Sequence, residues 1–360
     1  MDSMQVKTAV VGLGKMGVSH LSIANAIPQL DVVAVCDSSA ILGQMVEKYT
    51  GLDCDTDFEK VLATPDLAAV IIATPTRLHE RMIASALDRG LHVFAEKPLT
   101  LSGDASEALA ARAEAAKLVA QVGFHYRFVG TFREAKRLLD AGAIGRVTHI
   151  MAEAYGPVVL KPSNKTWRSS AQEGGGCLYD YAAHPLNLMN WYFGQPTDCT
   201  GAILANPLSA EVDDAVYATM RFGGGVTGQL SVNWSDDSVR KMTTRVSIWG
   251  DRGKIYADRQ ELQLHCNGTP PEGYNKGWTV KYITELTEPV SFYLRGEEYS
   301  AQLEAFGASI LDGRPVENSF RSAAETDRTI EMIRAANAGE RAAAETVPAR
   351  SRGRFFGLGR

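Results

Sequence analysis

Short hydrophobic runs alternate with amphipathic segments in the first third of the chain. The runs predict buried strands at 6–11, 32–36, 66–73, 91–95 and 118–123, and the segments between them predict helices at 18–29, 40–49, 76–89 and 102–117. A strand that is regularly followed by a helix is typical of a parallel, doubly wound α/β sheet. Ligands of such sheets bind beyond the carboxyl ends of the strands, so we expect a binding edge there.

The hydrophobic period changes to two beyond residue 124, which predicts strands at 147–155, 215–222, 226–234, 243–249, 254–257, 261–265 and 280–283. Glycine turns at 223–225 and 250–253 indicate antiparallel hairpins. Helices are expected at 132–141, 299–311 and 323–338. The second half is therefore predicted to be an α+β domain on a mostly antiparallel sheet. We divide the chain into domains at 1–125 and 126–340, followed by a mobile tail at 341–360.

Composition restricts the class of protein. A chain of 360 residues favours two domains, and a net charge of −5 gives no support for a nucleic-acid or membrane partner. Its five cysteines include no C-x-x-C pair, and the odd number argues against a disulfide framework, so we expect a cytoplasmic protein. The sequence shows neither a signal-peptide pattern nor an apolar stretch of membrane-spanning length.

The first strand leads into a G-x-G-x-x-G motif. Gly12 would allow a tight turn, Gly14 the approach of a pyrophosphate, and Gly17 close packing of the next helix. Asp37 closes the second strand, where a carboxylate would accept both ribose hydroxyls, and residues 38–47 hold no Lys or Arg for a 2′-phosphate. These features predict a Rossmann domain that binds NAD, against the alternative of a glycine-rich turn with a solvated Asp. The expected cofactor contacts here are Gly12, Leu13, Gly14, Lys15, Met16, Gly17, Asp37 and Ser38.

Further candidates follow the third and fourth predicted strands. Thr74, Pro75 and His79 are expected at the cofactor, as are Glu96 and Lys97. A lysine beside a nicotinamide can donate a hydrogen bond to a substrate oxygen, whereas the alternative is a solvated lysine at a strand end. The sequence leaves open whether the Lys97–Pro98 peptide is cis or trans.

A glycine-rich segment of the second domain carries Asp180 and His184. Their spacing would place both side chains on one face of a helix, where a carboxylate could orient an imidazole acting as general base. The alternative is a helix cap beside a half-buried histidine, and Pro185 counts against a regular helix. Four other histidines are predicted to be structural or solvated: His20, His92, His149 and His265. No group of residues in the sequence has the spacing of metal ligands.

Taken together, these motifs resemble the Gfo/Idh/MocA oxidoreductase family over residues 6–338. The resemblance rests on the glycine motif, Ala73-Thr74-Pro75 with His79, Glu96-Lys97-Pro98, and Gly174-Gly175-Gly176 followed by Asp180 and His184. It implies a Rossmann domain followed by a domain whose open sheet forms a homo-oligomer interface, in a dimer or tetramer. It also implies that Lys97, Asp180 and His184 meet at the nicotinamide as catalytic residues.

The same resemblance implies that the substrate is a sugar or cyclic polyol bound by Lys97, Arg127, Trp167, Arg168, Asp180, His184 and Asn187. Two positions depart from the family pattern. Ala182 stands where a glycine is frequent, and Asn187 stands where inositol dehydrogenases carry an acid. An amide binds sugar hydroxyls differently from a carboxylate, which argues against an inositol substrate.

Three functions follow as hypotheses. The first is an NAD(H)-dependent dehydrogenase or reductase that acts on a secondary alcohol of a sugar or polyol. The second is an enzyme with tightly held NAD that oxidises its substrate transiently, as in lyases, epimerases or glycosidases of this kind. The third is a non-catalytic regulatory protein that senses a sugar or NAD, against which the presence of Lys97, Asp180 and His184 argues.

Overall fold

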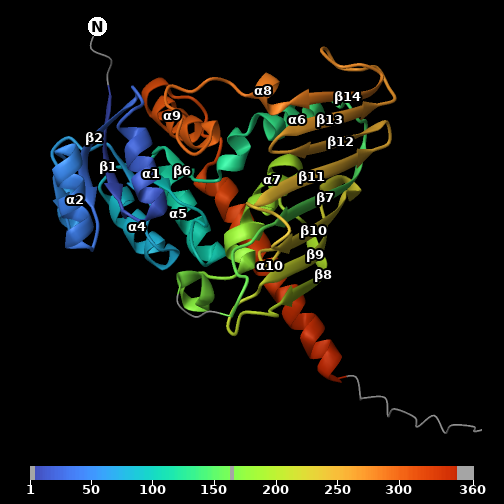
Figure 1. The fold of residues 1–360 in the computed structure, drawn as a ribbon, viewed down its shortest axis with the longest axis horizontal. Helices are drawn as coiled ribbons and strands as arrows, with labels where there is room; N and C mark the ends of the chain where they lie inside the picture. Colours follow the sequence, from blue (N-terminus) through green and yellow to red (C-terminus); the bar gives the residue numbers. More distant parts are fainter. Residues whose placement is uncertain (1–4, 163–165, 347–360) are drawn as a thin grey trace, which may run out of the picture.

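The computed structural model describes residues 5–162 and 166–346, which form two β-sheets with helices between them (Figure 1). The first sheet is parallel, with the strand order β3-β2-β1-β4-β5-β6 that defines the Rossmann fold. Its strands are β1 (Val6–Val11), β2 (Leu30–Cys36), β3 (Cys54–Asp55), β4 (Ala69–Ile72), β5 (His92–Ala95) and β6 (Ala120–Val122). The predicted doubly wound sheet is therefore confirmed.

The helices of this half are α1 (Lys15–Ala24), α2 (Ala40–Thr50), α3 (Phe58–Leu62), α4 (His79–Asp88) and α5 (Gly103–Ala115). Helix α1 begins earlier than the predicted 18–29, because Gly14 is already its N-cap. It ends at Ala24, before Pro28, and β2 starts at Leu30. Strand β3 and helix α3 were not predicted, since a two-residue strand and a five-residue helix are too short to show a hydrophobic period.

The second sheet has the order β14-β13-β12-β11-β7-β10-β9-β8, and only β7 and β10 pair in parallel among its described strands. Its strands are β7 (Val147–Tyr155), β8 (Asp198–Ala205), β9 (Ala215–Arg221), β10 (Thr227–Asn233), β11 (Thr243–Gly250), β12 (Gly253–Asp258), β13 (Glu261–Cys266) and β14 (Gly277–Tyr282). The mostly antiparallel sheet is thus confirmed. Strand β8 was not predicted, because the register shift between Cys199 and Gly201 breaks its alternation.

Helices cover one face of this sheet and leave the other open. The remaining helices are α6 (Gly130–Asp140), α7 (Ala183–Phe193), α8 (Ile283–Leu286), α9 (Glu297–Asp312) and α10 (Phe320–Thr346). Helix α10 runs between the two sheets and packs on α5, α7 and β8 (Figure 1). It extends to Thr346, into the segment predicted as a tail, and residues 347–360 lie outside the described residues.

Helix α9 belongs to the core of the first sheet although it comes late in the sequence. Leu303 and Phe306 of α9 are fully buried in one cluster with Val10 and Ile71. In the described ranges 5–162 and 166–346, no helix is long and apolar enough to cross a membrane.

Candidate active site

The glycine turn between β1 and α1 is shaped by its backbone. Gly12 has φ +89°, and a Cβ there would lie 2.8 Å from the Ala73 carbonyl oxygen. A Cβ at Gly17 would lie 1.6 Å from the Gly12 carbonyl oxygen, so only glycine allows this approach of α1 to the turn. A Cβ at Gly14 would meet no described atom within 4 Å. The space beside Gly14, at the start of α1, is therefore open, which fits the pyrophosphate of a dinucleotide.

Asp37 stands beside this turn at the carboxyl end of β2. One oxygen of its carboxylate accepts a hydrogen bond from the Leu13 amide (2.6 Å) and the other accepts from the Ser39 amide (2.8 Å). Ser38 is exposed, and Asp37 is partly exposed. The acid predicted to bind the adenine ribose is thus fixed within reach of the edge where the glycine turn lies.

His79 does not face this edge, contrary to the prediction that it contacts the cofactor. It is fully buried; Nδ1 lies 3.1 Å from the carbonyl oxygens of Pro98 and Leu99, and Nε2 lies 3.0 Å from that of Thr74. Its ring therefore connects the loop after β4 to the loop after β5. The second of these loops contains the Lys97–Pro98 peptide, which is cis.

Glu96 is held beneath this loop by two partners. Its Oε1 lies 2.6 Å from Nε2 of His20 on α1, and its Oε2 accepts from the Lys97 amide at 3.2 Å. Burial alone would raise the pKa of Glu96, but the hydrogen bond from His20 and the charges of His20 and Lys97 outweigh it and lower the pKa. The carboxylate thus ties α1 to the backbone of Lys97.

Lys97, Asp180 and Arg168 form a buried cluster of charges. The Lys97 ammonium donates to Oδ1 of Asp180 (2.9 Å) and to the Asp180 carbonyl oxygen (2.8 Å), while Arg168 donates to Oδ2 (2.8 Å). Burial alone would raise the pKa of Asp180, but the two cations outweigh it and lower the pKa. The Arg168 guanidinium also lies 4.7 Å from the ring centre of Trp167, which is partly exposed. The structure thus unites four residues that the sequence predicted to share a site.

His184 lies in an aromatic pocket at the start of α7. A π-helical turn, Leu178–Ala182, precedes α7, and this wider turn accommodates Pro185. The His184 ring packs against Phe124, His125 and Tyr126, with ring centres 6.2, 4.9 and 4.8 Å away. Burial, reinforced by the charges of Lys97 and Arg259, lowers the pKa of His184 well below its usual value. The imidazole is therefore neutral near pH 7.

The predicted hydrogen bond between Asp180 and His184 does not form. In the described structure the Asp180 carboxylate is held by Lys97 and Arg168, and Nδ1 of His184 is buried without a partner. The i, i+4 spacing that suggested the contact assumes a regular α-helix, whereas Asp180 lies on the π-helical turn.

Arg127 and Asn187 bond to each other and to the C-terminal segment. Nε of Arg127 donates to Oδ1 of Asn187 (2.8 Å), and its Nη1 donates to the Glu317 carbonyl oxygen (2.9 Å). The Asn187 amide donates to Thr326 on α10 (3.0 Å). Both residues are nearly fully buried. These contacts use the groups that were predicted to bind a sugar, so the prediction that the two residues face the substrate is not supported.

A second ion pair lies near His184 and was not predicted from the sequence. Arg259, in the turn between β12 and β13, bonds to Glu298 at the start of α9, and its guanidinium lies 5.7 Å from the ring centre of Tyr126. No local pattern marks either residue, because their proximity depends on the docking of α9. The contact of the aromatic residues in segment 124–128 with His184 was not predicted either. Among the described residues, no group of His, Cys, Asp and Glu has the arrangement of a metal site.

Comparison with known proteins gives the family. Residues 6–124 match the model of the oxidoreductase family with an NAD-binding Rossmann fold, and residues 132–256 match that of the GFO/IDH/MocA C-terminal domain. The scyllo-inositol 2-dehydrogenase (NAD(+)) of Bacillus subtilis is 30% identical over 263 residues, which cover 70% of this chain and 73% of the relative. The 2,7-anhydro-N-acetylneuraminate hydratase of Mediterraneibacter gnavus is 28% identical over 333 residues, 87% of this chain and 88% of the relative.

Among solved structures, a levoglucosan dehydrogenase in complex with NADH and levoglucosan superposes with a TM-score of 0.84 at 23% identity, and the match covers 94% of this chain and 98% of that one. The likeness at this identity concerns the fold. The strand order, the open glycine turn and the matches to both domain models agree with one another. The chain belongs to the Gfo/Idh/MocA oxidoreductase family, and its first sheet is an NAD-binding Rossmann fold.

Proposed function

We propose that this protein is an NAD(H)-dependent dehydrogenase or reductase that acts on a secondary alcohol of a cyclic polyol, a sugar or a sugar derivative. One observation carries the proposal: a largely buried lysine, fixed by Asp180, lies near enough to a neutral histidine, His184, for its charge to help lower the pKa of that histidine. A fixed hydrogen-bond donor and an unprotonated imidazole are the two groups that the oxidation of an alcohol requires.

When bound, NAD would supply the acceptor for the hydride that leaves the carbon carrying the hydroxyl group. His184 takes the hydroxyl proton in the direction of oxidation, for which its lowered pKa keeps a lone pair available. The Lys97 ammonium donates a hydrogen bond to the oxygen that gains negative charge. In reduction, His184 returns the proton to the same oxygen.

Asp180 and Arg168 are positioning residues in this scheme. Asp180 holds the Lys97 ammonium through two acceptors, so the lysine has one donor left for the substrate. Arg168 fixes the second oxygen of Asp180 and brings the partly exposed Trp167 beside it. An indole next to hydroxyl-binding groups offers a flat apolar surface on which a sugar ring can pack.

The test follows the absorbance of reduced nicotinamide while polyols and sugars are offered with NAD⁺ and, in parallel, with NADP⁺. We expect a signal with NAD⁺, and kcat at least about 100-fold lower in His184→Ala and Lys97→Ala. The NAD affinity should stay near the wild-type value in both variants. Unchanged turnover in both variants would refute the assignment, and a strong preference for NADP⁺ would refute the role given to Asp37.

A second candidate is transient oxidation by tightly bound NAD, followed by elimination or addition of water and return of the hydride. It is favoured by the similarity to a hydratase over 87% of this chain. This reaction yields product without net NADH. Protein that carries NAD after purification and converts a sugar without any change in nicotinamide absorbance would support this candidate over the dehydrogenase.

We further propose that the second domain, residues 126–340, supplies the substrate site with its covered face and a homo-oligomer contact with its open face. The open face carries five exposed apolar side chains on its outer strands: Ile203, Tyr217, Trp278, Val280 and Tyr282. Side chains of this size are rarely grouped on a surface that stays in contact with water.

A further inference from the structure

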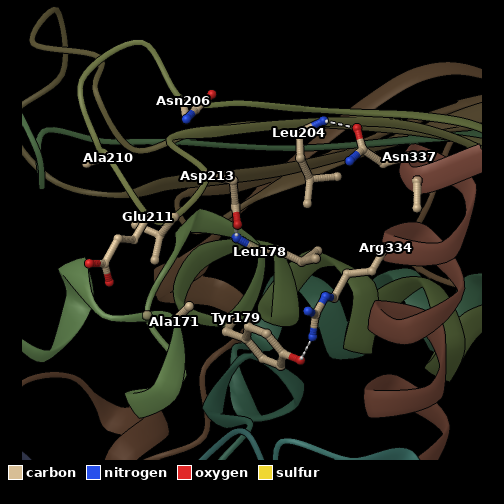
Figure 2. A pocket seen from close by; sticks show the side chains of 13 residues that line it. Ala171, Leu178, Tyr179, Leu204, Asn206, Ala210, Glu211, Asp213, Arg334 and Asn337 are labelled. Carbon is tan, nitrogen blue, oxygen red and sulfur yellow. Dashed lines mark hydrogen bonds between the residues drawn. The ribbon is translucent and has the colours of Figure 1, made fainter. Parts of the chain in front are cut away.

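A cavity of about 440 Å³ lies beside the π-helical turn (Figure 2), and Lys97 is not among the residues that line it. Its walls come from the turn itself, from the loop before β9 and from α10, and its polar lining is Tyr179, Asn206, Glu211, Asp213, Arg334 and Asn337. The volume is within the range of roughly 300–1,000 Å³ that is usual for small-molecule sites. We propose that this cavity binds a small hydroxylated organic anion, a sugar acid or a sugar phosphate.

Arg334 is the group that selects an anion. Its guanidinium donates to the Tyr179 hydroxyl at 3.1 Å; within the described ranges no carboxylate forms a salt bridge with it, although its charge favours the ionised form of Asp213 in the same lining. Arg328, on the same helix, bonds in contrast to Asp104, Glu107 and Glu331. An arginine without a carboxylate at the wall of a cavity retains donors that fit the two oxygens of a carboxylate or phosphate.

The remaining polar groups suit hydroxyls rather than a second anion. Asn337 accepts from the Leu204 amide (3.0 Å) through its side-chain oxygen, so its NH₂ group remains a donor. The side chain of Glu211 points away from Arg334 in Figure 2, and Asn206 lies above both. A ligand with its anionic group at Arg334 would reach Glu211 and Asn206 with hydroxyls, because a carboxylate accepts hydrogen bonds from hydroxyl groups but repels another negative charge.

The cavity is mechanically connected to the candidate active site. Asp213 accepts from the Leu178 amide (2.6 Å) through its side chain and from the Cys177 amide (2.8 Å) through its carbonyl. It therefore fixes the start of the turn that places Tyr179 in the cavity wall and Asp180 on Lys97. A ligand that contacts Tyr179 contacts the same turn that carries Asp180, so the site is suited to regulation of the reaction.

Binding is tested on the full chain by titration calorimetry in saturating NAD⁺, which keeps the probes out of the dinucleotide site. The probes are D-gluconate, D-glucose 6-phosphate and the neutral D-glucose. We expect one of the two anions to bind in a way that depends on Arg334, and the better anion distinguishes a carboxylate from a phosphate ligand. D-glucose is expected to bind only at the candidate active site, if at all, so its affinity should be the same in the wild type and in Arg334→Met. Binding of neither anion, or binding of D-glucose that Arg334→Met weakens as much as that of the anion, would overturn the proposal.

Two variants locate the binding. Arg334→Met should weaken the anion by about tenfold or more, because it removes a charge-assisted hydrogen bond. Asn206→Asp places a negative charge on an exposed loop of the cavity and should weaken anion binding as well. This variant keeps the proposal testable if Arg334→Met does not fold.

The matched control Arg314→Met removes an exposed arginine outside the cavity lining and should leave the affinity for the anion unchanged. Wild-type affinity in either folded cavity variant would refute the site. This readout does not depend on catalytic activity, so it stands apart from the test of the dehydrogenase.

Discussion

The three glycines of the turn before α1 meet different requirements within six residues. Gly17 is needed because the Gly12 carbonyl occupies the position of a side chain, whereas the space beside Gly14 is open. The sequence motif predicted both requirements, because each follows from how a strand, a turn and a helix connect. Replacing each glycine by alanine separates the requirement of the fold from that of the cofactor.

We expect Gly14→Ala to fold with wild-type stability, within about 0.5 kcal/mol, and to bind NAD more weakly, because its methyl group enters the space left for the pyrophosphate. Gly17→Ala should lose about 3 kcal/mol or more, since α1 must move away from the turn. Urea unfolding measures stability, and titration of protein fluorescence with NAD⁺ measures affinity. Equal affinity of Gly14→Ala and the wild type would contradict the proposed phosphate contact.

The low pKa of His184 predicts the pH dependence of alcohol oxidation. A base must be unprotonated to act, so kcat/KM should stay constant on acidification through pH 6.5, the ordinary value of histidine, and fall only at lower pH. The Arg259 charge contributes to the low pKa, so Arg259→Gln should raise this pKa and move the fall of kcat/KM to higher pH. The measurement is kcat/KM against pH.

Arg137→Gln is the matched control for this experiment, because Arg137 is also paired with a glutamate but is itself exposed, on the solvent side of α6. It should leave the profile unchanged. A wild-type profile that falls at or above pH 6.5, or a profile that Arg259→Gln does not move, would show that His184 is not the titrating base.

The sequence predicted which residues belong to the candidate site better than it predicted the hydrogen-bond partners of their side chains. The sequence identified Asp180 and His184, but the π-helical turn between them directs Asp180 to Lys97 instead. Likewise, Asn187 was expected at the sugar and instead bonds to Arg127 and to Thr326 of α10. Local spacing cannot reveal these contacts, because the partners are separated by many residues in the chain.

At the scale of elements, α10 shows how a helix can bring a buried carboxyl to a catalytic loop. Oδ2 of Asp327 accepts from Ser106 of α5 (2.7 Å) and from the Thr100 amide (3.3 Å), three residues after Lys97. Its Oδ1 is buried without a partner in the described structure. Burial raises the pKa of Asp327 to about 7, so α10 docks best when this carboxyl keeps its proton.

Stability should therefore fall with rising pH. The carboxyl titrates near 3.8 in the unfolded chain and near 7 in the folded one, so the folded state binds more protons between these values. Asp327→Asn does not titrate, and its stability relative to the wild type should rise by about 2 kcal/mol from pH 5 to pH 8. Urea unfolding at the two pH values measures the difference.

Asp312→Asn is the control, because it removes an exposed carboxylate at the end of α9. We expect it to change stability by less than about 0.5 kcal/mol at both pH values. A difference between Asp327→Asn and the wild type that is the same at pH 5 and pH 8 would exclude Asp327 as the titrating group.

The strands of both sheets were predictable wherever burial is regular. Strand β9 alternates between buried and exposed residues, and β4 is buried throughout, so both patterns stand out in the sequence. Strand β8 has neither pattern, because the bulge near Cys199 interrupts its alternation. The hydrophobic pattern therefore missed this edge of the second sheet, as it missed the two-residue edge strand β3 of the first.

At the scale of the whole molecule, the chain returns to its first sheet after completing the second. Leu303 and Phe306 of α9 complete the core beside β1, and α10 packs on α5 through the ion pairs of Arg328. The predicted domain boundary at residue 125 does not describe this return of the chain to the first sheet. The amphipathic pattern of a helix does not show on which sheet the helix packs, so the return could not be predicted. The candidate active site depends on it, because Glu298 of α9 pairs with Arg259 and Asp327 of α10 supports the loop after Lys97.

This folding back leaves the outer face of the second sheet uncovered. Ile203 and Tyr217 are paired across β8 and β9, more than 40% of each is exposed, and they line a hollow of about 370 Å³ on this face. Trp278, Val280 and Tyr282 repeat the arrangement along β14. We expect light scattering coupled to size-exclusion chromatography to show a dimer or tetramer.

Tyr217→Lys should shift this oligomer toward the monomer, because burying an unpaired ammonium in an apolar contact costs several kcal/mol. The control Ile41→Lys places the same charge at another exposed apolar site, on α2 beside the first sheet, and should leave the mass unchanged. A monomeric wild type, or a Tyr217→Lys variant with the wild-type mass, would mean that the exposed side chains of β8 and β9 do not form the contact. Because the active-site residues lie on the covered side of the sheet, a monomeric variant with full activity would further separate assembly from catalysis.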